Sequence, residues 1–539
     1  MSLESLRRTQ PENIQPLALE SFAGRSIGAR ISHAKRKITT KQGWFGDYDY
    51  AWLCLPSLPY GNNSTKRSPP FYSLDAELPL ALAMANGLQH ALAMLAGLIT
   101  PPIIFASALS LDSETSAYMI SASLIGSGIL TLVQLSRIRL FGGYYLGTGL
   151  ISVVGTSFST VSTANAIFDA MYRDGTCSST TAADGTVTRN SCPDAYGKLL
   201  GTSLICSLLE IFLAFVPPRI LKRILPPLVT ASLVESSGVP NWGGGSNCLT
   251  SPSGIFALCP SVTAPWLLPF GSPDILLTEM FGSPFLKNIS IIVGLAVGCI
   301  VAGAAGYIDG SSITTAPPIT FLWVHTFKIG VYPPAILPIS CAMEATGDIT
   351  ASAEVSRVDV EGIEFDSRVQ GGILSDGLGG FISALFTVAP LSVFAQNNGV
   401  IAITCCANRV AGRWCCAFLI LFGVLGKISG VFLAILNPII GAVTTFLFAS
   451  VAVSGVRVLA LMKFTRRDRF ILAAGVNNPN SGLAGLFNSI TIVLSTPFLA
   501  AGLVALILNA ILPVEVNEVV TRDDQSDAED QQDCNSVEK

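Results

Sequence analysis

Long apolar runs separated by short polar stretches fill the chain between residues 75 and 513. The longest approach or reach the roughly 20 residues that a helix needs to cross a bilayer. They are Leu78–Ile99, Ile289–Ala305, Phe418–Leu436 and Ile490–Leu512. The segments before and after this region are polar. The pattern predicts an all-α polytopic membrane protein with a polar segment at each end.

Two apolar regions are interrupted in the same way. Gly142–Phe158 and Pro390–Gly399 each contain a short β-prone stretch, then small or polar residues, then a short helical segment. Matching breaks in two halves of a chain are typical of transporters with inverted repeats, in which the N-termini of broken helices face a midplane site. Such breaks survive in a membrane only where they contact protein or line a cavity.

The second break carries a row of amide side chains, Gln396, Asn397 and Asn398, followed by Gly399. An amide in hydrocarbon is costly unless a partner pairs with it. Each amide offers donors and acceptors on one plane. These groups suit an uncharged ring that has its own N–H and C=O groups, so this break is a candidate binding site.

Composition supports the membrane prediction. Half of the residues are hydrophobic, 13% are charged and the mean hydropathy is +0.56, whereas a soluble protein has roughly twice that charged fraction. The chain has no basic patch with interleaved aromatics, which argues against nucleic-acid binding. It also has no metal-ligand cluster, nucleophile–base pair or nucleotide-binding loop, so we expect neither an enzyme nor a cofactor.

The distribution of Lys and Arg predicts the orientation. The first seventy residues are basic and lack an early apolar core, which favours a cytosolic arm over a signal peptide. The basic residues placed on the same side are Arg137, Arg139, Arg219, Lys222, Arg223, Arg357, Arg368, Arg409, Arg413 and Lys463–Arg469. The loops around 172–196 and 241–265 then lie outside. Each loop contains a pair of cysteines, Cys177 with Cys192 and Cys248 with Cys259. The sequence is consistent with either a disulfide or free thiols in each pair.

The motif Gln396-Asn397-x-Gly-x-x-x-x-Thr404 resembles the signature of the nucleobase–ascorbate transporter family, and Cys405–Arg409 resembles the fungal uric acid–xanthine permeases. The resemblance extends from residue 46 to about residue 513. It implies inverted seven-span repeats, up to 14 helices, with two short midplane β-strands and separate core and gate domains. The implied segments are a cytosolic arm (1–74), core halves (75–218 and 333–432), gate halves (219–332 and 433–513) and a cytosolic acidic tail (514–539).

The resemblance also implies a substrate site. Glu344 would accept hydrogen bonds from purine N–H groups, Gln396 would pair with the carbonyl and N–H edge of the ring, Phe158 would stack on it, and Ala395 belongs to the same set. From the residues alone, a carboxylate inside a span is a functional candidate. The alternatives are a protonated packing residue for Glu344 and ordinary core packing for Phe158.

Supporting roles follow in the same way. Asp348 and Asp376 are expected at helix ends near the core, as caps or interfacial charges or, for Asp376 by resemblance, in proton coupling. Gln89 and His90 lie within the first span, where His90 is expected to brace the site.

Three positions of the second-half motif complete the set. Asn397 is expected to hold local architecture, and Thr404 to line the inner exit. Cys405 occupies a position that is usually basic in the family's purine transporters, which leaves the preferred purine open.

Four expected spans are too short for a bilayer. They lie near residues 225–240, 266–284, 335–353 and 470–475. Because half a helix cannot cross the hydrocarbon core, we favour missing exon segments over genuine trimming, and we expect a partly truncated gate.

Two functional hypotheses follow. The first is proton-coupled uptake of oxopurines such as xanthine and uric acid across the plasma membrane, with purine, proton and lipid as partners and a homodimer left open. The alternative is a non-transporting or mis-spliced product that retains the core motif but has an incomplete gate.

Overall fold

The computed structural model describes residues 71–140, 142–181, 187–216, 290–306, 311–331, 337–360, 362–393 and 397–435, with 39–46 and a few residues near 37 and 277–286. The chain forms two compact units, residues 1–48 with 79–82, and residues 49–78 with 83–539. In the first unit, helix α2 (Lys41–Phe45) begins after Thr40, whose Oγ1 accepts a hydrogen bond from the Gly43 N–H (3.1 Å). The second unit contains the candidate site.

Three described helices are long and apolar enough to cross a membrane: α4 (Leu80–Ala108), α5 (Ser113–Ser136) and α7 (Pro193–Ala214). Helices α18 (Arg409–Val424) and α19 (Gly426–Leu433) pass the same test as a pair, although the chain bends by 77° between them. At 1.5 Å per residue, more than 20 residues span the hydrocarbon core. The structure therefore agrees with a multi-pass membrane protein.

The other elements are shorter or more polar. The helices are α6 (Phe158–Arg173), α13 (Ser290–Ala304), α14 (Ser311–Thr315), α15 (Leu337–Val355), α16 (Ile363–Leu385) and α17 (Asn397–Thr404). The strands are β1 (Ile138–Arg139), β2 (Tyr145–Leu146), β3 (Val154–Gly155), β4 (Ser179–Thr181), β5 (Val187–Arg189) and β6 (Ser392–Val393). All the described strands form two-stranded antiparallel pairs, β1 with β2, β3 with β6, and β4 with β5.

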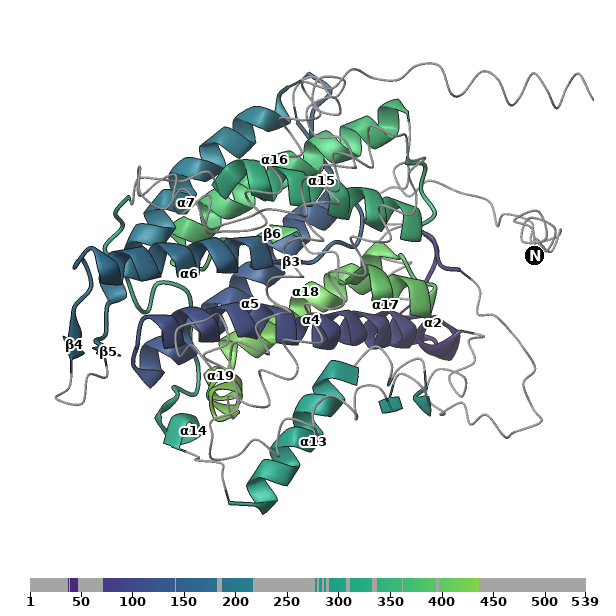
Figure 1. Cartoon of the computed structure of the whole chain (residues 1–539). Helices are drawn as coiled ribbons and strands as arrows, with labels where there is room; N and C mark the ends of the chain where they lie inside the picture. Colours follow the sequence, from purple (N-terminus) through teal and green to yellow (C-terminus); the bar gives the residue numbers. More distant parts are fainter. Residues whose placement is uncertain are drawn as a thin grey trace, which may run out of the picture. The chain divides into compact units, whose positions relative to one another are not determined.

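The pair β3–β6 joins the two sequence breaks. Val154 is opposite Val393 and Gly155 is opposite Ser392, and the two strands lie side by side among the helices (Figure 1). Each strand is two residues long. The register places the start of α6 and the start of α17 at the same short ribbon.

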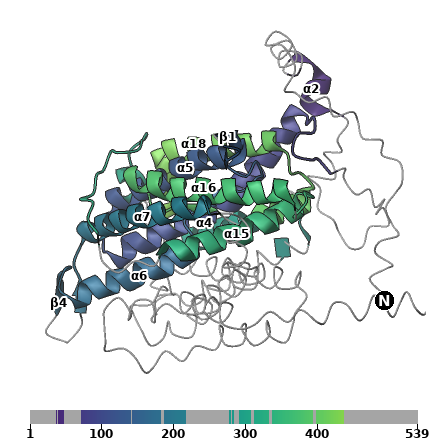
Figure 2. The same cartoon turned by 90° about the horizontal axis from the view of Figure 1, so that it is seen from above.

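Small residues bring the helices close together. α5 packs along α18, and α7 packs along α16 (Figure 2). A Cβ at Gly128 would lie 2.9 Å from the Cys416 carbonyl oxygen, and one at Gly423 would lie 2.8 Å from the Ser121 carbonyl oxygen. Neither site has room for a side chain. Such small-residue contacts are typical of helix packing in membranes, where backbones approach without a hydrophobic driving force.

One of the four expected short spans, near 335–353, lies within the described residues. Here α15 is a continuous helix of 19 residues, although it is not among the described helices that are apolar enough to cross a membrane. Glu344 and Asp348 interrupt the apolar pattern without interrupting the helix. The segments 225–240 and 470–475 lie outside the described residues, as does most of 266–284.

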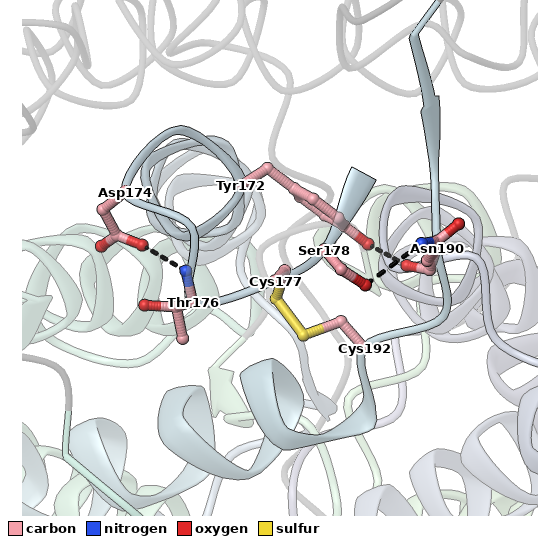
Figure 3. The surroundings of a disulfide bond; sticks show 7 residues. All are labelled: Tyr172, Asp174, Thr176, Cys177, Ser178, Asn190 and Cys192. Atoms are coloured by element: carbon pink, nitrogen blue, oxygen red, sulfur yellow. Dashed lines mark hydrogen bonds between the residues drawn. A yellow bond between two sulfur atoms is a disulfide. The ribbon is translucent and has the colours of Figure 1, made fainter. Parts of the chain in front are cut away.

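The loop between α6 and α7 contains a disulfide. Cys177 and Cys192 are joined by an S–S bond of 2.03 Å (Figure 3). Neighbouring hydrogen bonds fix the loop, from the Tyr172 hydroxyl to the Asn190 carbonyl (2.7 Å) and from Asn190 Nδ2 to Ser178 Oγ (3.1 Å). Of the two alternatives for this pair, the structure has the disulfide. Cys248 and Cys259 lie outside the described residues.

Candidate functional site

Two half-helices begin at the β3–β6 ribbon. Ser157 precedes α6, and its Oγ accepts a hydrogen bond from the Thr160 N–H (3.4 Å). α17 begins at Asn397, four residues after β6 ends at Val393. The two helices lie on opposite sides of the ribbon (Figure 1). Because the N-terminus of a helix carries unpaired N–H groups and partial positive charge, the ribbon is a polar location inside an apolar protein.

Asn397 connects the two breaks. Its side chain is fully buried, its Nδ2 donates to the Ile151 carbonyl, and its Oδ1 accepts from the Val153 N–H (3.3 Å). These are backbone groups of the first break that no helix pairs. One amide therefore satisfies a donor and an acceptor next to β3. The next residue, Asn398, accepts a hydrogen bond from Ser352 Oγ on α15 (2.8 Å).

Asp376 holds the strand β6. Its Oδ1 accepts from the Val393 N–H (2.7 Å) and its Oδ2 from Ser392 Oγ (2.9 Å). The expectation that Asp376 lies at a helix end is wrong, because it lies inside α16 and only 2% of it is exposed. The neighbouring Gly377 does not end the helix; it allows close packing, since a Cβ there would lie 2.9 Å from the Ile211 backbone nitrogen of α7.

Asp348 is also inside a helix rather than at an end. It lies within α15 and is 6% exposed. α15 packs against α6, α17 and β6, so both carboxylates belong to helices that border the two breaks. Both expectations are wrong because α15 and α16 continue without a break past these carboxylates.

Gln89 and His90 lie in the middle of α4. Both are fully buried, and neither the amide atoms of Gln89 nor the ring nitrogens of His90 have a hydrogen-bond partner in the structure. One turn earlier, Asn86 hydrogen-bonds the Cys406 thiol just beyond α17. Buried polar groups without partners are rare in folded proteins, so this part of α4 is equipped to hold a polar ligand or water.

The remaining sequence candidates are placed incompletely. Gln396 and Ala395 lie outside the described residues, directly between β6 and α17. Only the backbone is described for Phe158, Glu344 and Thr404. Phe158 is the first residue of α6, Glu344 lies within α15 and Thr404 is the last residue of α17.

Sequence reasoning missed Glu210. It lies in α7, is 4% exposed and hydrogen-bonds Asp376. The signal was present, because Glu210 is a carboxylate between Leu209 and Ile211 in an otherwise apolar run, and such residues are functional candidates by default. The residues that hold β3 were also missed, since nothing distinguishes Ser127 and Thr131 from other hydroxyl residues of α5.

Basic side chains surround the entry to the first break. Arg368 donates to the Thr148 carbonyl (2.9 Å) and Arg409 to the Gly149 carbonyl (2.8 Å). Arg409 also pairs with Asp75 (2.9 Å), and Glu364 pairs with Arg368 (2.8 Å) and Arg137 (3.0 Å). These contacts fix Thr148 and Gly149 next to the loop after α5.

Cys405 lies in a backbone turn. Its φ is 54°, its carbonyl accepts from the Tyr72 N–H (2.8 Å), and its side chain is half-buried. The residues after it are tied to the same segment, because Asn408 Nδ2 donates to the Ala76 carbonyl (2.7 Å). Among the described residues, no group of three or more His, Cys, Asp or Glu side chains could hold a metal ion.

Comparison with known proteins decides the family. The sequence profile described as the permease family matches residues 82–476. The chain belongs to the nucleobase–ascorbate transporter family. This member is therefore a membrane permease and not an enzyme.

Named relatives cover most of the chain. It is 43% identical to a uric acid–xanthine permease of Emericella nidulans over 94% of each chain, and 45% identical to a purine permease of the same fungus over 93% of each. It is 31% identical to the xanthine permease XanQ of Escherichia coli, over 82% of this chain and 93% of that one.

Solved structures resemble the chain more distantly. The transmembrane domain of the cyanobacterial bicarbonate transporter BicA superimposes with a TM-score of 0.49 at 13% identity, over 79% of this chain and 96% of that one. The structure of SLC26A9 gives a TM-score of 0.49 at 12% identity, over 78% of this chain and 64% of that one.

Proposed function

We propose that this permease takes up oxopurines such as xanthine and uric acid across the plasma membrane together with a proton. The observation that carries the proposal is the β3–β6 ribbon, which brings the first break to the amide motif that follows β6. The names of the fungal and bacterial relatives favour a purine. The buried carboxylates favour a proton, because they are the groups inside the membrane that can carry one.

The substrate site in this proposal consists of Gln396, Glu344, Phe158 and Ala395. Among the elements that carry or flank them, α15 packs against α6, β6 and α17. A ring bound there would exchange hydrogen bonds with Gln396 and Glu344. Such a site discriminates strongly between rings, because a wrong ring leaves buried polar groups unpaired.

The orientation of the protein in the membrane follows from the groups at the two ends of its helices. The disulfide Cys177–Cys192 is tied to the α4–α5 connection, because the Cys192 N–H donates to the Leu109 carbonyl (3.1 Å). Disulfides persist in oxidising compartments, so this end faces outside. Arg137 begins the connection at the other end of α5, and basic loops stay in the cytosol. The N-terminus and the C-terminal tail are then cytosolic.

The proposed architecture has two inverted repeats with a core and a gate. α4 to α7 and α15 to α18 belong to the core ranges 75–218 and 333–432, and the β3–β6 ribbon joins one half to the other. Most of the gate ranges, 219–332 and 433–513, lies outside the described residues. In this arrangement the core would move against the gate to expose the site alternately.

A second candidate is a chain that retains the core but cannot complete the gate. One observation favours it. The match to the Emericella nidulans uric acid–xanthine permease runs over 551 aligned positions but contains 94% of this chain, which has 539 residues. The relative therefore has residues at positions where this chain has none, as expected from its short spans.

The experiment compares two proteins in cells that lack purine transporters. One is this chain, and the other has the short spans restored from the Emericella nidulans relative. Uptake of radiolabelled xanthine and uric acid by both, rising at acidic external pH and abolished by a protonophore, is expected if the chain is an active symporter. Uptake by the restored protein alone favours the second candidate. Uptake that follows sodium and ignores the protonophore contradicts proton coupling.

A further inference from the structure

A small cavity lies behind the β6 strand, between α6, α7 and α16. Its volume is about 20 Å³, which is enough for one water molecule. Six of the residues that line it are Thr160, Ser203, Ser207, Glu210, Asp376 and Ser392. These six contribute hydroxyl and carboxyl groups to a lining that also contains Cys206, Gly380, Pro390 and Leu391. Such polar groups can stabilise a buried water or a proton inside an apolar protein.

Glu210 lines this cavity and has an unpaired carboxyl oxygen. Only 4% of Glu210 is exposed, it lines the cavity, and its Oε1 has no hydrogen-bond partner in the structure. Its carboxyl group is also in hydrogen-bond contact with Asp376 of α16. Two glycines of α16 make this approach possible, because a Cβ at Gly377 would lie 3.2 Å from Glu210 Cγ and one at Gly380 would lie 2.5 Å from Ser207 Oγ.

The contact between the two carboxyl groups requires a proton. Ionised carboxylates only accept hydrogen bonds, so one of the pair must donate, as in other buried carboxyl pairs that cannot both ionise. Both oxygens of Asp376 already accept from β6, through the Val393 N–H and Ser392 Oγ. Glu210 has an oxygen without such a donor, and it is therefore the better place for the proton.

We propose that Glu210 and Asp376 share the proton that is transported with the substrate. This inference rests on the proton coupling proposed above and assigns Glu210 as its second carboxyl group. The proton passes from outside water to a carboxylate oxygen of Glu210, and the new O–H group donates a hydrogen bond to Asp376. That O–H bond breaks when the proton passes to water on the cytosolic side. The hydroxyl groups and the single water site of the cavity provide its local path.

The pair links protonation to the candidate site through β6. With the proton present, α7 and α16 are joined by a hydrogen bond. When the proton leaves, two like charges face each other in a buried site. The repulsion changes the hydrogen bond that Asp376 accepts from the Val393 N–H. Val393 is the last residue of β6 before the amide motif.

No other strong acid or base competes for this proton among the described residues that line the cavity. Asp376 comes from α16 and the Cys206 thiol from α7, and the other lining residues of α6, α7, α16 and residues 390–392 are neutral. α15 also packs on α7, but none of its described residues lines the cavity.

The test uses the full chain in proteoliposomes and the substitution Glu210→Gln. Glutamine resembles a permanently protonated Glu210, because its amide still donates to Asp376. The expected result is that xanthine exchange at equal pH on both sides persists, whereas accumulation driven by a pH gradient and xanthine-induced proton flux fall at least tenfold. The matched control is Glu114→Gln, which makes the same substitution at an exposed side chain of α5 and should keep both activities.

The outcomes separate this inference from the function it rests on. A wild-type chain without proton-driven uptake overturns both. Proton-driven uptake by the wild type and, undiminished, by Glu210→Gln overturns the role of Glu210 and leaves the proposed function standing. If Glu210→Gln does not reach the membrane, Glu210→Asp keeps the ionisable group but withdraws it from Asp376. It should shift the external pH at which uptake is half-maximal by more than one unit, and an unchanged pH profile overturns the proposal.

Discussion

The two breaks have matching backbones but are held by different chemistry. β3 is held by hydroxyl groups of α5, because the Val154 N–H donates to Thr131 Oγ1 (2.9 Å) and the Val154 carbonyl accepts from Ser127 Oγ. β6 is held by the carboxylate of Asp376 on α16. Hydroxyl groups are neutral at every physiological pH, whereas a carboxylate gains or loses charge. The first break is therefore a fixed support, and the second can respond to a proton.

The largest expected effect concerns the residues after β6 and on α15. Gln396→Ala and Glu344→Ala should each abolish purine uptake while the protein still reaches the membrane, because each removes hydrogen bonds that the ring cannot replace. Glu344→Gln should fold but bind more weakly, since one acceptor becomes a donor. Uptake of radiolabelled xanthine and surface labelling measure the two quantities. Wild-type uptake in both alanine variants would contradict the site assignment.

The substitutions Asp376→Asn and Thr131→Val test whether the two breaks differ in role. Asp376→Asn should remove proton-driven uptake at every external pH, because an asparagine cannot ionise. Thr131→Val removes one neutral hydrogen bond and should lower the free energy of unfolding by about 1–3 kcal/mol while uptake persists. Thermal unfolding of the purified proteins and uptake assays distinguish the two. Equal losses of uptake would show that the halves do not differ in role.

A smaller effect is expected at the end of α17. Cys405→Arg places a basic group where purine transporters of the family usually have one, and it should sharpen the preference between xanthine and uric acid. Cys405 is half-buried with its backbone tied to Tyr72, so a long side chain can reach water. Competition of unlabelled purines against labelled xanthine measures the preference, with Cys405→Ser as the control. Identical competition profiles would show that residue 405 does not set the preference between purines.

The smallest effect concerns the start of α5, the helix that supports the first break. Asp112 caps this helix, and the hydrogen bond from the Thr115 N–H (3.0 Å) lowers the pKa of its carboxyl group. A lowered pKa in the folded state means that the stabilisation is present above the unfolded pKa, and it is lost as pH falls through the folded value.

Asp112→Asn keeps a good cap but cannot titrate. The wild type should therefore be slightly more stable than Asp112→Asn at neutral pH, and the difference should vanish in acid below the ordinary Asp range. Tryptophan fluorescence during heating at several pH values measures it. A difference that is constant with pH would show that Asp112 does not contribute in this way.

Some of the site was predictable from the sequence because the signals are local. An apolar run of about 20 residues has no stable place in water, so α4 follows from the run Leu78–Ile99. The breaks follow from polar residues, Gly and Pro within such runs. The motif from Gln396 to Thr404 gave the family, and the comparisons confirm it.

Other features depended on residues far apart in the chain. The pairing of Val154 with Val393 and the hydrogen bond from Asn397 to Ile151, which are 246 residues apart, arise only when the helices pack. The choice of a disulfide for Cys177 and Cys192 needed both cysteines at the end of the same loop.

The sequence by itself determined that this is a multi-pass permease with two broken segments and a polar motif in the second. It did so because hydropathy and motif are properties of neighbouring residues. The tertiary structure decided which backbone groups the polar residues satisfy, and it paired Glu210 with Asp376 across two helices. The physical reason is that a buried polar group must find its partner in three dimensions, and its identity depends on how the helices pack.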